Sequence, residues 1–321
     1  TVKAADAGGL FTTQSFTIDV SNVNEPPAAI ADADAGDNTV AENAASGTPV
    51  GVTALASGDP DAGDTISYSL FDDAGGRFAI DPSSGVVSVA GGSLLNFEAA
   101  ASHSLTVKAA DAGGLFTTQS FTIAVSNVNE PPAAIADADA GANTVAENAA
   151  SGTTVGVTAL ASGDPDAGDA IAYSLFDDAG GRFAIDPSSG VVSVAGGSLL
   201  NFEAAASHSL TVKAADAGGL FATQSFTIDV SNVNEPPTGL ALSNDTIAEN
   251  AGADAVVGSL SASDADLPAQ TLTFSLPEGL GDNAAFNIVG TSLRANGSFD
   301  FETRASYTVT VRVTDDGVPA L

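Results

Sequence analysis

The sequence contains no cysteine, no methionine and no tryptophan, and only 8 of its residues are lysine or arginine. Without cysteine the chain has no disulfide bonds and no thiolate metal ligands. No apolar run approaches the ~20 residues that a membrane-spanning helix needs, so we expect no direct membrane insertion in this segment. Because 40 acidic residues face those 8 basic ones, the net charge is −32, which argues against nucleic acid or an anionic membrane as a partner.

Such acidity is typical of disordered chains, but 44% of the residues are hydrophobic and they alternate regularly with polar ones. Valine, isoleucine, threonine and phenylalanine recur in short runs that glycine, aspartate, asparagine and proline separate. No stretch shows a sustained period of 3.6 residues. We therefore expect folded domains built from strands, with helix nearly absent.

The segment Asn-Val-Asn-Glu-Pro-Pro occurs three times, at 22–27, 127–132 and 232–237. Two consecutive prolines stop any strand or helix, and the spacing of 105 residues is typical of one small domain. The segment therefore marks domain junctions. The predicted domains are 1–27 as the last two strands of a truncated upstream repeat, 28–132 and 133–237 as nearly identical repeats, and 238–321 as a diverged repeat lacking its final strand.

One repeat contains seven runs that alternate apolar and polar residues. They are Val40 to Asn43, Val50 to Leu55, Ile66 to Leu70, Phe78 to Ile80, Val87 to Val89, Leu105 to Ala109 and Phe121 to Val125. Because each run has a single apolar face, two sheets packed face to face would bury all seven faces. The pattern predicts an all-β fold of tandem seven-stranded antiparallel Greek-key β-sandwiches, arranged as a linear rod.

The acidic residues gather at strand ends and in loops as five short motifs. In the first complete repeat these are Ala41-Glu42-Asn43, Asp59-Pro60-Asp61, Leu95-Asn96-Phe97-Glu98, Ala110-Asp111-Ala112-Gly113 and Asn127-Val128-Asn129-Glu130. Their carboxylate, amide and backbone oxygens are the ligands that Ca²⁺ prefers. Six carboxylates at one junction repel one another unless cations neutralise them, and three Ca²⁺ would balance a charge of about −6.

These five motifs, in this order, resemble those of cadherin repeats, and the resemblance covers essentially the whole chain. The near-identical copies rich in alanine, glycine and aspartate look more like large bacterial surface adhesins than vertebrate cell–cell cadherins. The resemblance implies that Ca²⁺ is held between successive domains, by ligands from the first domain, the linker and the next domain.

Carried over to this sequence, the resemblance implies four ligand sets. The junction between 28–132 and 133–237 would use Glu42, Glu98, Asn129, Glu130, Asp164, Asp166 and Asp216. The next junction would use Glu147, Glu203, Asn234, Glu235, Asp264, Asp266 and Asp315. Two incomplete sets are Asn24, Glu25, Asp59, Asp61 and Asp111 near the N-terminus, and Glu249, Asp300 and Glu302 near the C-terminus.

Two departures from the family pattern affect the expected function. Asn96 and Asn201 replace an aspartate that Asp300 retains, so the outermost calcium of both complete junctions loses a charged ligand. Without tryptophan, the strand-swapped adhesion of vertebrate cadherins has no candidate residue.

A second candidate calcium loop, Asp32-Ala-Asp34-Ala-Gly36-Asp37, has its glycine one place early and no flanking helices, so we interpret it as a solvated loop.

The resemblance implies an extracellular or cell-surface array that Ca²⁺ stiffens for cell adhesion, with any anchor outside this segment. Its partners would be other cadherin-like arrays or another cell-surface molecule. The alternative is a passive calcium-stiffened stalk of a large secreted or surface protein. A carbohydrate-binding module would need an exposed aromatic platform, which 3 tyrosines and no tryptophan do not supply. No group of residues suggests catalysis, so we do not expect an enzyme.

Overall fold

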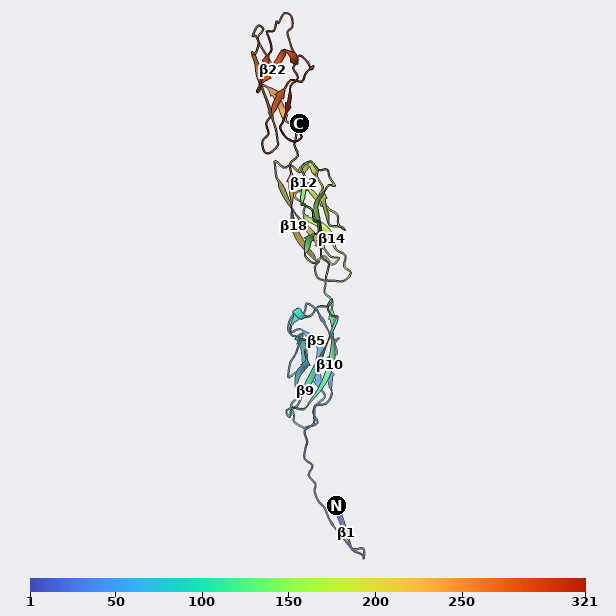
Figure 1. Cartoon of the computed structure of the whole chain (residues 1–321). Coiled ribbons are helices and arrows are strands. Elements are labelled where there is room, and N and C mark those ends of the chain that lie inside the picture. The colour runs from blue at the N-terminus through green and yellow to red at the C-terminus, as the bar shows by residue number, and fades with distance from the viewer. The chain divides into compact units, whose positions relative to one another are not determined.

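A computed structural model describes residues 1–321 as two compact units, Thr1–Glu130 and Pro131–Leu321, each of which is described by itself (Figure 1). Strands make up nearly all of the regular structure, as the sequence predicts. The helical elements are single 3₁₀ turns, η1 (Gly92–Leu94), η2 (Gly197–Leu199) and η3 (Asn283–Ala285). None of them has the length or the apolar character that crossing a membrane requires.

The first unit contains one complete β-sandwich. One sheet has the order β3-β5-β8-β7, with bounds Ile30–Asp32, Pro49–Ala56, Val86–Val89 and Phe78–Ile80. The facing sheet has the order β4-β10-β9-β6, with bounds Thr39–Ala41, Phe116–Ser126, Ser102–Ala110 and Ser67–Asp72. The two-sheet architecture confirms the predicted sandwich.

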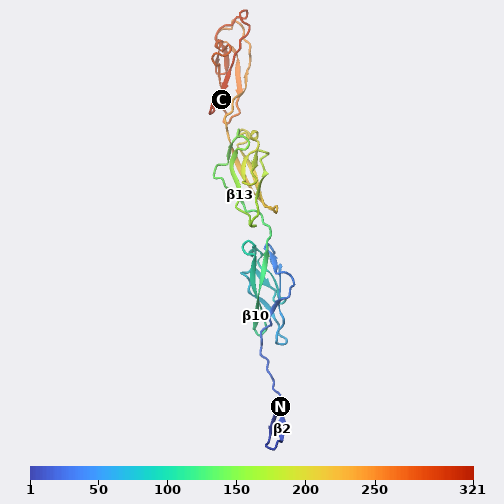
Figure 2. The same ribbon diagram turned by 90° about the vertical axis from the view of Figure 1, so that its right-hand side faces the viewer.

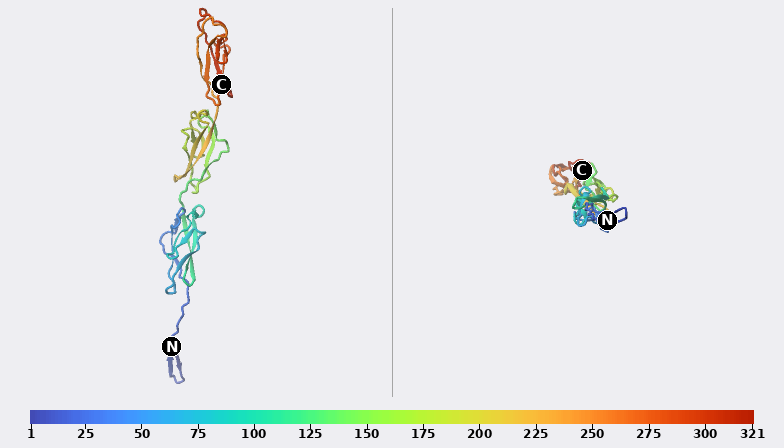
Figure 3. Two further views of the ribbon diagram at one scale, coloured as in Figure 1. Left: turned by 90° about the vertical axis from the view of Figure 1, so that its left-hand side faces the viewer. Right: turned by 90° about the horizontal axis from the view of Figure 1, so that it is seen from below.

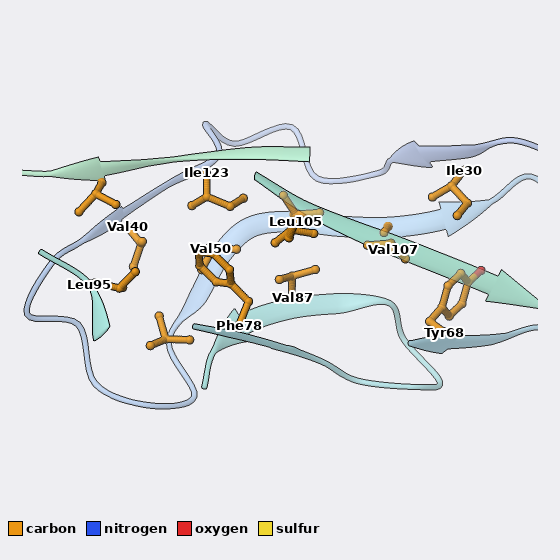
Figure 4. Close-up of a cluster of buried hydrophobic side chains, with 14 of the residues drawn as sticks. Ile30, Val40, Val50, Tyr68, Phe78, Val87, Leu95, Leu105, Val107 and Ile123 are labelled. Carbon is orange, nitrogen blue, oxygen red and sulfur yellow. The ribbon is translucent and has the colours of Figure 1, made fainter. Parts of the chain in front are cut away.

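The core of this sandwich lies between the two sheets and is made by the alternating residues of each strand (Figure 4). Leu105 and Ile123 of the β9–β10 sheet are completely buried, and so are Val50 and Val87 of the facing sheet. Burial contributes roughly 25 cal/mol per Å² of apolar surface, so this core stabilises the sandwich without any contribution from metal.

The second unit begins with a nearly identical sandwich. Its eight strands are β11 (Ile135–Asp137), β12 (Thr144–Ala146), β13 (Thr154–Ala161), β14 (Ala172–Asp177), β15 (Phe183–Ile185), β16 (Val191–Val194), β17 (Ser207–Ala215) and β18 (Phe221–Ser231). The sheet orders are β11-β13-β16-β15 and β12-β18-β17-β14. The same residue positions are buried as in the first sandwich, as the sequence repeat requires.

The structure adds one detail to the predicted sandwich, because the first strand is divided between the two sheets. β3 pairs with β5 in one sheet, whereas β4 joins the other sheet and pairs with β10 in parallel. Between β3 and β4 the main chain makes two turns. The Asp34 amide donates to Asp32 Oδ1 (3.0 Å), and the Gly36 amide donates to Asp34 Oδ1 (2.9 Å). These Asx turns break the strand and let the chain cross from sheet to sheet.

A third, smaller sandwich completes the second unit. One sheet has the order β19-β20-β23-β22, with bounds Thr238–Leu242, Val256–Ser263, Ser292–Ala295 and Phe286–Val289. The other contains only β21 (Thr273–Ser275) and β24 (Arg312–Thr314). Residues 307–311, which precede β24, are not part of a strand. No strand equivalent to β10 or β18 lies beside residues 307–311 to complete a ladder along them.

The N-terminal residues form a hairpin of β1 (Val2–Ala5) and β2 (Phe11–Gln14) (Figure 2). The second of these strands ends at Gln14, and residues 15–27 form no strand. Phe16, Ile18 and Val20 are 65, 85 and 93% exposed. Without a facing sheet these side chains have no core to stabilise an extended ladder.

We expect acid to destabilise the two complete sandwiches through His103 and His208. Both imidazoles have a buried Nε2 with no hydrogen-bond partner, and both lie edge-on against a phenylalanine. Burial, and secondarily the nearby charge of Arg77 or Arg182, lowers the pKa of each histidine below its ordinary value of 6.5. The folded state therefore disfavours protonation, and its stability falls as the pH drops below 6.5.

Chemical denaturation at pH 7.5, 6.5 and 5.5 measures this effect. The double variant His103→Leu, His208→Leu should lose most of the decline between pH 6.5 and 5.5, because leucine has no proton to gain. A variant that retains the full decline would assign the acid sensitivity to other groups.

Candidate metal centres

The second unit brings together carboxylates from two successive sandwiches and from the segment that joins them. Glu147 follows β12, Glu203 lies in the loop after η2, and Glu235 lies just before β19. Oxygen atoms of these three carboxylates lie within 4.8 Å of one another. The turn after β20 adds Asp264 and Asp266.

Glu147 organises the first half of this cluster from a buried position. Its Oε1 accepts a hydrogen bond from the Val233 amide (2.7 Å), and its Oε2 accepts one from the Phe202 amide (2.7 Å). One carboxylate therefore holds the joining segment and the Glu203 loop together. Glu42 makes the same two bonds to the amides of Val128 and Phe97 in the first unit, each at 2.7 Å.

Asp264 and Asp266 tie the next sandwich to the joining segment. The amide of Asp266 donates to Asp264 Oδ1 (3.0 Å), which forms a tight Asx turn and brings both carboxylates to the same edge. Asp266 Oδ2 then accepts a hydrogen bond from the Glu235 amide (3.0 Å). These contacts direct the carboxylates of both sandwiches toward the segment that joins them.

The electrostatics of this cluster are unfavourable without a cation. Burial, and then the Glu147 carboxylate, raises the pKa of Glu203 above its ordinary value. Burial also raises the pKa of Glu235, together with the charges of Glu147 and Glu203 and those of both aspartates. No basic side chain relieves this repulsion, since the one ion pair of the chain joins Arg304 to Asp282 elsewhere.

Several oxygen atoms in this cluster are buried and have no hydrogen-bond partner. They are both carboxylate oxygens of Glu203, Oε2 of Glu235, Oδ2 of Asp264 and Oδ1 of Asp266. Buried polar atoms in proteins are nearly always paired, so a group of unpaired anionic oxygens indicates a missing positive partner. Hard oxygen donors without nitrogen or sulfur ligands suit Ca²⁺ better than a transition metal. The donor set therefore fits Ca²⁺.

Asn234 and Asp315 complete the predicted set. The Nδ2 of Asn234 donates to the Pro319 carbonyl (3.0 Å), so the C-terminal segment returns to the base of the third sandwich (Figure 3). Asp315 is buried, accepts a bond from the Gly317 amide (3.0 Å) and is also bonded to the Asn234 side chain. Asp315 thus joins the cluster through Asn234.

The residues predicted for the other complete junction are divided between the two units, so each unit contains half of that set. In the first unit, carboxylate oxygens of Glu42, Glu98 and Glu130 lie within 4.8 Å of one another, and Asn129 directly precedes Glu130. In the second unit, Asp164, Asp166 and Asp169 form a similar group. Asp216 directly follows β17 and is buried. Its Oδ1 accepts a hydrogen bond from the Leu220 amide (2.9 Å).

The two incomplete sets differ in burial. Near the N-terminus, Asp61 accepts hydrogen bonds from the Glu25 amide (2.8 Å) and the Asn22 side chain, and these bonds lower its pKa. The Nδ2 of Asn24 donates to Asp111 Oδ2 (2.9 Å). Asp59 belongs to the same group of carboxylates as Asp61. In contrast, Glu249, Asp300 and Glu302 form an exposed group near the C-terminus.

Two carboxylates were missed by the sequence analysis. Asp64 lies within 4.8 Å of Asp59 and Asp61, and Asp169 occupies the same place in the next repeat. Burial, followed by the charges of Asp59, Asp61 and Asp111, raises the pKa of Asp64. The sequence does show this third aspartate, in Asp-Pro-Asp-Ala-Gly-Asp. Only the folded turn brings its carboxylate close to those of the first two aspartates.

Asn96 and Asn201 lie where the sequence analysis expects a weakened calcium ligand. Their Oδ1 atoms accept hydrogen bonds from the amides of Ala99 and Ala204, each at 2.6 Å. Asp300 accepts the Thr303 amide in the same way at 3.2 Å. The asparagines therefore preserve the turn while removing the charge.

Comparison with known proteins gives one consistent result. The family model described as "Cadherin domain" matches residues 37–126 and 142–231. Human protocadherin Fat 1 is 31% identical over 99% of this chain, and Drosophila melanogaster protein dachsous is 27% identical over all of it. The chain spans only 7% and 9% of the length of these two relatives.

Solved structures agree with the sequence comparisons. Mouse cadherin-23 EC22-24 superposes with a TM-score of 0.63 at 27% identity, covering 89% of this chain and 92% of that one. The protocadherin gamma-B4 extracellular domain has a TM-score of 0.62 at 24% identity, covering 94% of this chain and 49% of that one, which supports the fold alone.

Proposed function

Because this chain belongs to the cadherin-domain family, we propose that it binds Ca²⁺ at the junctions between successive sandwiches and so stiffens an adhesion array. The observation that carries this proposal is the group of buried, unpaired carboxylate oxygens on Glu203, Glu235, Asp264 and Asp266. Bound Ca²⁺ would supply the positive charge that this chain's own side chains do not.

The residues of this cluster have different roles in binding the ion. Glu147 uses both oxygens to position the backbone of the joining segment and the Glu203 loop. Glu203 and Glu235 present oxygens without competing hydrogen bonds, so they are free to act as ligands. Asp264 and Asp266 bring the next sandwich to the same ions, with Asn234 and Asp315 completing the set. Six carboxylates carry a charge that about three Ca²⁺ would balance.

The same roles are proposed for the corresponding residues of the other junction. Glu42, Glu98, Asn129 and Glu130 would act from the first domain and its linker, and Asp164, Asp166 and Asp216 from the next domain. We extend this set to Asp169, and extend the N-terminal set of Asn24, Glu25, Asp59, Asp61 and Asp111 to Asp64. The proposed domain boundaries remain 28–132, 133–237 and 238–321.

Such a segment functions outside the cell, at the surface or in a secreted protein. Cadherin-type relatives are adhesion proteins rather than enzymes. We propose that the array takes part in cell adhesion, with another cadherin-like array or a different surface molecule as its partner. Calcium-dependent self-association of whole-domain arrays would favour homophilic adhesion, whereas a monomer would favour a stalk or a different partner.

Isothermal titration with CaCl₂ tests the proposed site directly. Glu235→Gln should weaken binding at least tenfold, about 1.4 kcal/mol, because it removes one charge and one ligand oxygen from the buried cluster. Glu278→Gln is the matched control, since it makes the same chemical change at an exposed glutamate of the third sandwich. Equal titrations of both variants and the parent chain would disprove the assignment.

We expect the sites to differ in affinity. The N-terminal set has no glutamates from a preceding sandwich in this chain, and the set of Glu249, Asp300 and Glu302 is exposed. Fewer charged ligands and more water weaken Ca²⁺ binding. The titration should therefore resolve at least two classes of site. A fit by one class of equivalent sites over the whole chain would contradict this expectation.

A further inference from the structure

The longest strands of each complete sandwich direct hydroxyl groups to the outside of their sheet. In β9 and β10, which lie side by side (Figure 1), the outward positions include Ser104, Thr106, Thr118, Ser120 and Thr122. In β17 and β18 the same positions are Ser209, Thr211, Thr223, Ser225 and Thr227. These side chains are exposed or half-buried, so each of the two sandwiches has an outer surface of hydroxyl groups, which we call the hydroxyl face.

The hydroxyl face is nearly free of negative charge, although the chain has 40 acidic residues. β9 and β10 contain no acidic residue, and β17 and β18 contain one, Asp229. On the neighbouring strand β6, Asp72 lies opposite Thr106, and its Oδ1 already accepts a hydrogen bond from the Ala74 amide (2.9 Å). A ligand on this face therefore meets mainly hydroxyl groups and few carboxylates.

The register of the sheet arranges these hydroxyl groups in rows across the strands. Thr106 lies opposite Ser120, and Ser104 lies opposite Thr122. The side-chain oxygens of Thr106 and Ser120 are hydrogen-bonded at 2.9 Å, and the second sandwich repeats this contact at the same distance. This bond uses one hydroxyl proton of the pair, so the other proton and the remaining lone pairs can bond to a ligand. Neighbouring strands are about 4.8 Å apart, which is close to the length of one sugar unit in an extended β-1,4-linked glycan.

Each hydroxyl face also carries an exposed aromatic ring. Phe116, at the start of β10, is 48% exposed, and Phe221 of β18 is 49% exposed. The Nζ of Lys108 lies 4.4 Å from the centroid of the Phe116 ring, a contact that helps to fix the position of the ring. A further ring, Phe71, is 69% exposed on the edge strand β6 of the same sheet. These phenylalanines supply the aromatic surface that tyrosine and tryptophan do not.

We propose that the hydroxyl faces bind a neutral, extended polysaccharide of the β-1,4-linked glucan type. Serine and threonine hydroxyls both donate and accept, so they can exchange hydrogen bonds with sugar hydroxyls in either direction. The C–H groups of a sugar ring pack against an exposed aromatic ring such as that of Phe116. The net charge of −32 repels an anionic polysaccharide but not a neutral one. Small hydroxyl side chains offer little of the tryptophan, tyrosine and arginine contact that dominates protein–protein interfaces, so a glycan fits this face better than a protein does.

Glycan binding would add a ligand to the proposed adhesion role without using the proposed calcium sites. None of the proposed calcium ligands belongs to the hydroxyl face. Because one polymer can engage both faces of a chain, the apparent affinity should exceed that of a single face. Binding is expected in Ca²⁺ and in chelator alike, so failure of the glycan experiment leaves the calcium titration unaffected, and the reverse also holds.

Affinity electrophoresis of the whole chain in native gels tests the proposal. Hydroxyethylcellulose is the neutral β-1,4-glucan probe, and carboxymethylcellulose is the control, because it has the same backbone with negative charges. We expect hydroxyethylcellulose to retard the chain in Ca²⁺ and in chelator, and carboxymethylcellulose to retard it much less. Absence of retardation by hydroxyethylcellulose, equal retardation by both polymers, or retardation that disappears in chelator would overturn the proposal.

The double variant Ser120→Asp, Ser225→Asp places a carboxylate on both hydroxyl faces. It should bind hydroxyethylcellulose about tenfold more weakly than the parent chain, because each face loses a hydroxyl donor and gains a charge that the glycan would cover. Ser88→Asp, Ser193→Asp is the matched control, since these serines are outward positions of the opposite sheet. Equal retardation of the two double variants would refute the assignment to the hydroxyl face.

The double variant Phe116→Ala, Phe221→Ala tests the aromatic contact. Its retardation by hydroxyethylcellulose should fall below that of the parent chain, because the sugar rings lose the surface against which they pack. Leu94→Ala, Leu199→Ala is the control, since these leucines are 44 and 45% exposed and lie outside the hydroxyl face. Thermal melts check that every variant is folded. A phenylalanine variant that binds hydroxyethylcellulose as tightly as the leucine variant would contradict the proposed contact.

Discussion

Millimolar Ca²⁺ is expected to raise the melting temperature of this chain by 10 °C or more over the value in chelator, on the order of 3 kcal/mol for each site at a hundredfold excess over Kd. The reason is that the carboxylates of Glu203, Glu235, Asp264 and Asp266 repel one another and have buried oxygens without hydrogen bonds. Both features lower the stability of the fold when no Ca²⁺ is bound. Ions that bind only the folded junction relieve both costs. Differential scanning calorimetry measures the shift.

Equal concentrations of Mg²⁺ provide the control for ionic strength and charge. Mg²⁺ requires near-ideal octahedral geometry and gives up its water reluctantly, so its effect should be much smaller. Far-ultraviolet circular dichroism should show little loss of strand on chelation, because each complete sandwich has its own apolar core. Superimposable melts in Ca²⁺ and chelator would contradict calcium binding at the junctions.

Glu203→Gln and Glu147→Gln are expected to change stability in opposite directions when calcium is absent. Both oxygens of Glu203 lack hydrogen bonds, so glutamine loses no bond there and removes a repelling charge. Glu203→Gln should therefore melt higher than the parent chain in chelator. In Ca²⁺ it should melt lower than the parent, because a ligand charge is missing.

Glu147→Gln should melt lower than the parent chain in both conditions. Its two oxygens each accept a backbone amide at 2.7 Å, and glutamine offers one NH₂ group where an acceptor is needed. A buried amide left without an acceptor costs about 1–3 kcal/mol. Thermal melts of both variants in Ca²⁺ and in chelator distinguish Glu203, which we expect to bind the ion, from Glu147, which we expect to hold the backbone in place. Parallel losses for the two variants in chelator would refute this division of roles.

Several features of the fold could be predicted because they depend on local chemistry. Alternation of apolar residues identified the inward faces of strands such as Pro49–Ala56, where Val50 and Val52 are buried. Consecutive prolines and turn residues marked where strands end. The division of the first strand between two sheets was not predicted, because the runs around Ile30 and Val40 are too short to show which sheet each joins.

The carboxylate motifs were recognisable because each is a short segment with its own turn. Asp64 was missed because its approach to Asp59 and Asp61 depends on how the loop folds back, which spacing alone does not reveal. Residues 16–20 also alternate apolar and polar side chains, yet they form no strand. An apolar face predicts a strand only where another sheet is available to cover it, and Ile18 and Val20 have none.

The sequence by itself determined the repeat, the all-β class and the acidic motifs that we propose as calcium ligands, since these depend on periodicity, composition and side-chain chemistry. Only the tertiary structure decided which carboxylates meet and which of their oxygens already accept hydrogen bonds. Glu147 and Glu203 illustrate the difference: both are acidic residues in similar motifs, yet each oxygen of Glu147 accepts a backbone amide, whereas the carboxylate oxygens of Glu203 are buried without a hydrogen-bond partner. That distinction depends on distances between segments far apart in the chain, which no local pattern encodes.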